Sequence, residues 1–202
     1  MKKIISTILI LIAFASTVQA EEVKMEDRVK DFINDVGGKI ISIASEKGAS
    51  EEKKKAKIIQ VIDESIDSEW ISRFVLGKNY KNVSDENKAQ FSKLYRDFMI
   101  NTYGPKFKNY NGRKFEVVEV NQQGGFYIAK SEFLPKDSNV PIDVQFKVKE
   151  RNGKLVILDF IAEGISLIET QRSEFNSAIS QKGVEKFLSD LEVRVKNLKS
   201  QK

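Results

Sequence analysis

The sequence predicts an α+β fold in which a four-stranded, twisted antiparallel sheet packs with N-terminal and C-terminal helices. Apolar residues recur every three or four positions before residue 112 and again after Gly164, as in amphipathic helices. Between these points they alternate with polar residues, as in strands. The composition, with 41% hydrophobic residues, 13 Phe and only 3 Pro, is typical of a packed chain. We therefore expect helices, then a sheet, then helices that return to it.

Two helices are expected at the start of the fold. Apolar residues form a stripe over residues 25–43, although Gly37 and Gly38 weaken its middle. Ser50, followed by two glutamates, is a typical N-cap and predicts the start of a second helix. The apolar side of this second helix carries Ile58, Ile59, Ile62 and Ile66.

Two further helices are expected before the sheet. A short one starts at Ser68 and stops at Gly77. A longer one is capped by Ser84 and should end after Tyr103, because Gly104-Pro105 follows. One face of the longer helix carries Phe91, Leu94, Tyr95, Phe98, Met99 and Thr102.

Four strands are expected, over residues 114–121, 126–134, 142–149 and 155–161. The third alternates regularly between apolar and polar residues, which predicts one buried and one wet face. Asn152-Gly153 predicts a hairpin turn, which could lie in a four-residue loop. The last strand is apolar on both faces except at Asp159, so it is predicted to be central and covered on both sides.

Two helices should complete the chain, over residues 165–179 and 184–198, with Gly183 between them. No internal repeat or low-complexity linker interrupts the pattern. Residues 21–202 are therefore expected to form a single domain.

The first twenty residues have the pattern of a secretory signal peptide. Lys2 and Lys3 precede an apolar run over residues 4–14, and a cleavage-like Val-Gln-Ala ends at Ala20. We expect residues 1–20 to be removed and the remainder to be exported and soluble. The alternative is an uncleaved N-terminal membrane anchor. Loss of both lysines lowers the net charge from +5 to +3, and nucleic acid is not an expected partner of an exported chain.

Most catalytic chemistry is excluded by composition. The chain has no His and no Cys, which excludes Ser-His-Asp and Cys-His nucleophiles, thiol redox centres and ordinary zinc or haem ligation. Asp63, Asp67 and Glu69 lack the alternating pattern of a calcium loop and are interpreted as solvated helix-end charges. No metal site and no cofactor are expected.

A surplus of large aromatic side chains remains. Either they pack a closed core, or the helices and sheet fail to close and leave an apolar space. Periodicity alone does not distinguish these. The aromatic residues are Phe74, Tyr80, Phe91, Tyr95, Phe98, Tyr103, Phe107, Tyr110, Phe115, Phe126, Tyr127, Phe133, Phe146 and Phe160.

Several segments, in this order, resemble one known family. They are Phe-Val-Leu-Gly at residues 74–77, Phe-Met-Ile-Asn-Thr-Tyr at 98–103, Tyr-Asn-Gly at 110–112, and Asp-Phe-Ile-Ala-Glu-Gly-Ile-Ser-Leu at 159–167, followed by Arg172 and Phe175. Together they resemble the MlaC family, also called toluene-tolerance proteins. The resemblance covers roughly residues 25–198. Asn79-Tyr80, Leu155 and Thr170-Gln171 depart from the common pattern of the family.

The resemblance implies a monomeric periplasmic phospholipid carrier, the binding component of an ABC transport system. Such a carrier would shuttle lipid between an outer-membrane lipoprotein-porin complex and an inner-membrane lipid ABC transporter complex, and so maintain outer-membrane asymmetry. The resemblance also implies that sheet and helices enclose an apolar lipid cavity, with bound phospholipid as cargo.

Within this picture we expect acyl contacts from the middle helices and the sheet, and two residues at the rim. The expected acyl contacts are Phe74, Val75, Phe91, Tyr95, Phe98, Tyr103, Phe126, Ile128, Phe146 and Val148. Tyr110 and Arg172 are expected at the rim, although Arg172 could instead form a structural salt bridge with Glu163 or Glu169.

Two other functions stay open. An exported holdase chaperone for outer-membrane proteins would fit the basic charge, the signal peptide and the helices. An enzyme on a related cone-shaped α+β scaffold could use Tyr110 and Asp159 for proton transfer.

Overall fold

The computed structural model describes residues 24–107, 112–135 and 139–200. The expected signal peptide and Tyr110 lie outside these residues. The helices and strands are α1 Met25–Ala44, α2 Glu51–Ser65, α3 Ser68–Leu76, the 3-10 helix η1 Gly77–Asn82, α4 Asp85–Phe107, β1 Gly112–Gln123, β2 Phe126–Pro135, β3 Ile142–Arg151, β4 Lys154–Ala162, β5 Ile165–Ser166, α5 Leu167–Lys182 and α6 Val184–Ser200. None of the helices in this part of the chain is long and apolar enough to cross a bilayer.

The predicted α+β class and antiparallel sheet are confirmed, with a fifth strand added. The strand order is β1-β2-β3-β4-β5, and all neighbours are antiparallel. The β3–β4 hairpin has a two-residue loop and not four, because Arg151 pairs directly with Lys154. Both loop residues have positive φ, 51° at Asn152 and 77° at Gly153, as a type I′ turn requires.

The predicted β4 has a strand on each side, but it lies next to the edge of the sheet. On one side β4 pairs with β3, but on the other it has only the two-residue β5. The predicted cover on both of its faces is confirmed, because the consecutive residues Ile157, Leu158 and Asp159 are all buried and α2, α3 and α5 contact the strand. A parallel bridge between Ile66 and Ile157 also joins it to the segment between α2 and α3. Helices therefore supply the cover that the apolar sequence of β4 predicted.

The two predicted N-cap serines, at the starts of α2 and α4, are confirmed. Ser50 Oγ accepts a hydrogen bond from the Lys53 amide at 3.3 Å, and Ser84 Oγ accepts one from the Asn87 amide at 3.2 Å. The predicted end of α4 after Tyr103 is wrong, because the helix continues through Gly104-Pro105 to Phe107. Proline removes one backbone donor, but its fixed φ is close to the helical value, so a last turn can retain its geometry.

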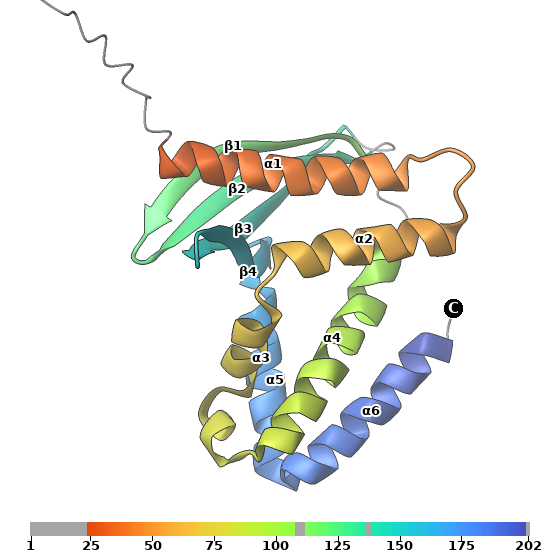
Figure 1. Ribbon diagram of the computed structural model, residues 1–202, viewed down its shortest axis with the longest axis vertical. Helices are drawn as coiled ribbons and strands as arrows, with labels where there is room; N and C mark the ends of the chain where they lie inside the picture. The colour runs from red at the N-terminus through yellow and green to blue at the C-terminus, as the bar shows by residue number, and fades with distance from the viewer. Residues whose placement is uncertain (1–23, 108–111, 136–138, 201–202) are drawn as a thin grey trace, which may run out of the picture.

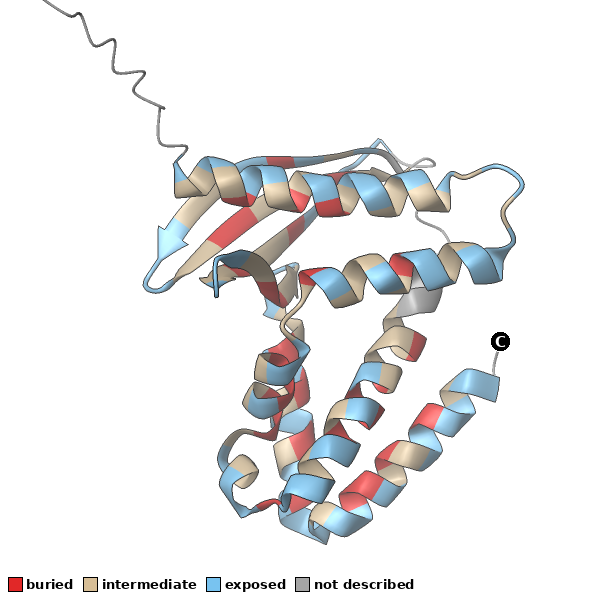
Figure 2. Cartoon of the chain, in the orientation of Figure 1, coloured by how far each residue is buried: buried red, intermediate tan, exposed pale blue. Residues whose placement is uncertain are grey.

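The elements form two packed regions that meet at β4 (Figure 1). In the first, α1 lies across β1 and β2 and α2 runs beside α1. In the second, α3, α4, α5 and α6 form a bundle that extends away from the sheet. Buried residues line the strands under α1 and the facing sides of the bundle helices (Figure 2). Ile66 packs against the core of both regions.

Candidate functional site

One face of the sheet is turned toward α1, and we call it the inner face. Residues directly opposite one another in an antiparallel pair share a face, so the strand register defines it. Val29, Ile33 and Val36 of α1 pack against it. Gly37 allows close approach, because the ring of Phe115 leaves no room for a Cβ there. The inner face carries Phe115, Val117, Ala129, Ser131, Phe133, Val144, Phe146, Val148, Ile157 and Phe160.

A row of three phenylalanines crosses this face from β1 to β4. The rings of Phe115 and Phe146 lie 6.1 Å apart, and those of Phe146 and Phe160 lie 5.5 Å apart, both edge to face. All three are only half-buried, whereas Val117 and Val148 nearby are fully buried. The helices therefore leave part of this aromatic row uncovered, which is apolar surface available to a ligand.

A buried hydroxyl on the same face has no hydrogen-bond partner in the part of the chain that the structure describes. Ser131 is 2% exposed, and its Oγ makes no hydrogen bond within the described residues. Asn101 Oδ1 and Thr102 Oγ1 of α4 are also buried without a hydrogen-bond partner among the described residues. Unpaired buried polar atoms cost free energy, and in native proteins water or a ligand commonly satisfies them.

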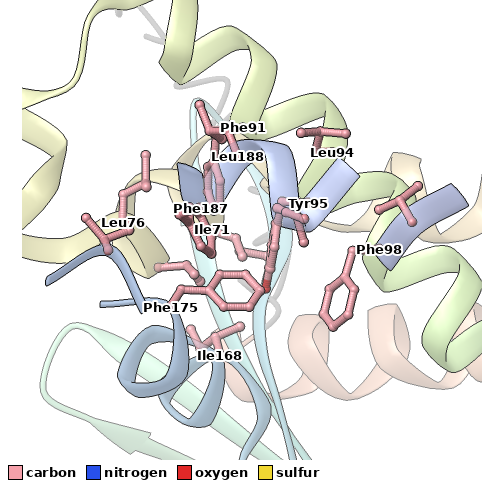
Figure 3. Packing of buried hydrophobic residues seen from close by; sticks show 14 residues of the cluster. Ile71, Leu76, Phe91, Leu94, Tyr95, Phe98, Ile168, Phe175, Phe187 and Leu188 are labelled. Atoms are coloured by element: carbon pink, nitrogen blue, oxygen red, sulfur yellow. The ribbon is translucent and has the colours of Figure 1, made fainter. Parts of the chain in front are cut away.

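The bundle brings four of the expected acyl contacts together, but as a closed core. Val75, Phe91, Tyr95 and Phe98 are each at most 4% exposed. Figure 3 shows the three aromatic residues around Phe175, with ring centroids 5.8 to 6.2 Å from it. Their surfaces are covered by other side chains, so a ligand could reach them only if the helices moved apart.

The four expected contacts in the sheet divide between its two faces. Phe146 and Val148 lie on the inner face, whereas Phe126 and Ile128 lie on the opposite one. Lys147 Nζ and Lys149 Nζ lie 4.4 and 4.9 Å from the centre of the Phe126 ring. The sheet therefore does not bring these four residues together on one face.

The expected acyl contacts leave out Ser131, Phe133 and Phe160, which also lie on the inner face, although a signal was present. In β2 the charged residues Lys130 and Glu132 occupy the positions that continue the alternation from Phe126 and Ile128. Period-2 alternation assigns all four to the outer face and the intervening residues to the inner one.

Tyr103, also expected to contact acyl chains, belongs to a polar group at the base of α5. The Tyr95 hydroxyl donates to Gln171 Oε1, and Gln171 Nε2 donates to the Tyr103 hydroxyl at 3.3 Å. Burial raises the pKa of Tyr95, so its hydroxyl keeps the proton that it donates. Gln171 is itself 2% exposed. These bonds fix α4 against α5 beneath the sheet.

Asp159 connects the sheet to the bundle. Its carboxylate accepts hydrogen bonds from Ser166 Oγ at 2.6 Å, the Phe160 amide at 2.8 Å and the Ile168 amide at 3.3 Å. Burial raises the pKa of Asp159, and the bond from Ser166 opposes this rise. These bonds join β4 to the start of α5, so the role of Asp159 in this structure is to stabilise that connection. Its expected catalytic partner, Tyr110, lies outside the described residues.

Phe74 and Arg172 lie in a separate groove of about 290 Å³ on the bundle. The Arg172 guanidinium lies 4.5 Å above the centre of the Phe74 ring. The alternative salt bridge with Glu163 or Glu169 is wrong, because the ion pairs of the described residues include none at Arg172.

A wider depression of about 590 Å³ is lined by α6 residues, so it is the flank of one helix and not an enclosed cavity. Within the described residues, no three carboxylates gather to hold a metal ion.

A curated relative, a solved structure and a family model match this chain. The intermembrane phospholipid transport system binding protein MlaC of Haemophilus influenzae is 21% identical over 131 residues, which span 63% of this chain and 61% of that relative. The match therefore covers less than two thirds of the relative's length. The solved phospholipid-binding protein of Ralstonia solanacearum, in complex with a phospholipid, superposes with a TM-score of 0.74 at 16% identity. That match covers 84% of this chain and 97% of the other, and it shows a shared fold. The model of the MlaC protein family matches residues 30–193, so the chain belongs to the MlaC family.

Proposed function

We propose that this protein binds a phospholipid and carries it through water between membranes. The observation that carries the proposal is the partly uncovered row of Phe115, Phe146 and Phe160 on a sheet face that α1 otherwise covers. Two relatives support it by their names, one a phospholipid transport binding protein and the other solved with a phospholipid.

The physical need for such a carrier follows from the cost of exposing lipid tails. Two acyl chains contain about 30 methylenes, and at about 0.8 kcal/mol each their exposure to water costs on the order of 24 kcal/mol. An apolar protein interior must offset nearly all of this cost. It must not exceed it by much, because a lipid bound far more tightly than in a bilayer would not be released.

The acyl chains would lie against the inner face, with the bundle core remaining closed. In this arrangement the buried Ser131 Oγ, which has no hydrogen-bond partner among the described residues, would lie on the same face as the acyl chains. No cofactor is needed, and the phospholipid is cargo. The protein would act as a monomer in the periplasm, after loss of residues 1–20, and would exchange lipid with an inner-membrane ABC transporter complex and an outer-membrane lipoprotein-porin complex. This exchange would maintain outer-membrane lipid asymmetry.

Lipid extraction tests the proposal directly. The full chain is expressed in a bacterial host with its own leader, purified without detergent, and analysed by native mass spectrometry and by organic extraction. We expect the mass of the protein plus one or more phospholipids. Protein that is free of lipid and also takes none from phosphatidylglycerol or phosphatidylethanolamine vesicles would contradict the proposal. Suppression of the aggregation of unfolded outer-membrane proteins by that lipid-free protein would favour the holdase chaperone.

A further inference from the structure

The groove on the bundle is a second candidate binding site, formed by α3, η1 and α5 with no contribution from the sheet. We call it the α3–η1–α5 groove. Aromatic rings form its apolar part: Trp70 stacks on Phe74 at 5.0 Å, and Tyr80 lines the groove beside them. All three rings are half-buried. Trp and Tyr in such positions are the residue types that dominate protein interfaces.

The charge of the groove is one-sided. Arg73, Lys81 and Arg172 line it, and no acidic residue does. Among the arginines whose side chains the structure describes, the others all pair with a carboxylate: Arg28 with Glu150, Arg96 with Asp63, Arg151 with Asp67 and Arg194 with Glu174. Both arginines without an ion pair in the described chain therefore lie in this one groove.

The two arginines are held in place by the rings below them. The Arg172 guanidinium lies 4.5 Å above the Phe74 ring, and the Arg73 guanidinium lies 5.2 Å above the Tyr80 ring. A guanidinium that stacks on a ring keeps its N–H edge free for a carboxylate, and its pre-organisation lowers the entropy cost of binding. The arrangement is therefore complementary to negative charge that is carried next to an apolar group.

The floor of the groove is firmly built. Gly77 has φ of 56°, and a Cβ there would lie 3.1 Å from Arg172 Nε. Asn176 Nδ2 donates to the Val75 carbonyl at 2.8 Å, and Asn79 Nδ2 donates to Asn176 Oδ1 at 2.7 Å. These bonds hold η1 on α5. At about 290 Å³ the groove is the size of one large side chain, and it lies at the lower end of the range for small-molecule sites.

We infer that the α3–η1–α5 groove binds an acidic peptide segment of a partner protein. One apolar side chain of the segment enters beside Trp70 and Phe74, and flanking carboxylates pair with Arg73 and Arg172. A flat anionic membrane surface fits less well, because it cannot fill a groove that is one side chain wide. The site does not depend on the proposed lipid cargo.

Trp70 is the only tryptophan of the sequence, so its fluorescence reports on the groove. The probe is an acetylated, amidated peptide Asp-Glu-Phe-Asp-Glu, titrated into the full chain at low salt. We expect a saturable change of Trp70 emission that weakens as salt is added. Replacing the Phe of the peptide by Gly should weaken binding about tenfold. A peptide Ser-Gly-Phe-Gly-Ser should bind at least tenfold more weakly.

The double variant R73E/K81E should bind the acidic peptide at least tenfold more weakly. The matched control K30E/K47E reverses two exposed lysines on α1 and the loop after it, and should bind like the parent. Circular dichroism and the lipid content of each variant show whether the fold is kept. If R73E/K81E does not fold, the peptide series and salt titration on the parent chain still decide the question. Equal binding of the acidic and neutral peptides, or no saturable signal, would overturn the inference. Sedimentation with phosphatidylglycerol vesicles that needs Arg73 and Lys81, without peptide binding, would also overturn it in favour of a membrane surface.

Discussion

Replacing Phe146 or Phe126 by alanine separates a lipid contact from a structural one. Both are half-buried phenylalanines on neighbouring strands, but Phe146 lies on the inner face and Phe126 on the outer face. The two substitutions remove the same atoms. If acyl chains lie on the inner face, only Phe146→Ala should release lipid.

The two variants should lose similar amounts of stability. Phe146 contacts two aromatic rings, and at about 0.5–1.5 kcal/mol for each pair the loss is about 1–3 kcal/mol. Phe126 loses contacts with two lysines, which at about 0.5–1 kcal/mol each amount to about 1–2 kcal/mol. The loss of lipid affinity in Phe146→Ala is worked separately. Removal of roughly 50 Å² of ring surface from the contact with lipid, at about 25 cal/mol per Å², weakens the binding free energy by about 1.3 kcal/mol, or about tenfold in affinity.

The measurements are urea unfolding for stability and transfer of a fluorescent phospholipid from vesicles for affinity. Phe146→Ala should need about ten times more vesicle lipid to reach half-saturation. Phe126→Ala should match the parent in this assay. Equal lipid loss in both variants, or loss only in Phe126→Ala, would refute the assignment of the inner face as the lipid wall.

Three more predictions concern the framework. Phe175→Ala should lower the free energy of unfolding by about 3–5 kcal/mol, since Phe175 is 2% exposed at the centre of the bundle core; a loss below about 1 kcal/mol in urea unfolding would contradict this. Asp159→Asn can keep both backbone amide bonds at its Oδ1 and can itself donate to Ser166 Oγ. It should be more stable than the parent at pH 7, because burial raises the pKa of Asp159 and so makes its ionised form unfavourable. This advantage should shrink as pH falls through the raised pKa toward about 4, and an advantage that grows on acidification would refute it. Gly77→Ala should lower the free energy of unfolding by about 1–3 kcal/mol, because φ is 56°; unchanged urea unfolding would contradict the strain.

The local elements could be predicted because short-range physics determines them. The sequence predicts Ser50 and Ser84 as helix N-caps, and both accept the capping hydrogen bond in the structure. The alternation of apolar and polar residues in β3 likewise predicts its more buried and its more exposed face. The cover of β4 could be predicted, because a strand that is apolar on both faces needs packed elements on both, and here α2, α3 and α5 contact it. Its place next to the sheet edge could not be predicted, because an apolar run does not report how many residues the next strand contributes. The predicted end of α4 lies too early, because a Gly-Pro pair usually ends a helix. The fixed φ of proline is nevertheless compatible with a last helical turn, and α4 continues to Phe107.

The candidate site was predicted in part, and the errors have one origin. Large aromatic residues were grouped by type, although a phenylalanine can fill a core, face solvent beside a lysine or line an open surface. Phe91, Phe126 and Phe146 illustrate these three environments. The strand parities of β2 and β3 together could have separated Phe126 from Phe146. The closed packing of Phe91 depends on α5 and α6, more than 80 residues away in sequence, and no local pattern reports such contacts.

If the protein carries lipid, the two regions must differ in how far they can move. Aromatic rings interlock around Phe175, and a close-packed core resists small displacements. The cover of the inner face is looser, because Phe115, Phe146 and Phe160 remain partly uncovered. Asp159 and Ile66 join the regions close to β4. Lipid entry would then require α1 and α2 to shift over the sheet while the bundle stays rigid. A rigid bundle would also keep the α3–η1–α5 groove in one shape whether or not lipid is bound, so a partner could engage the loaded and the empty carrier equally.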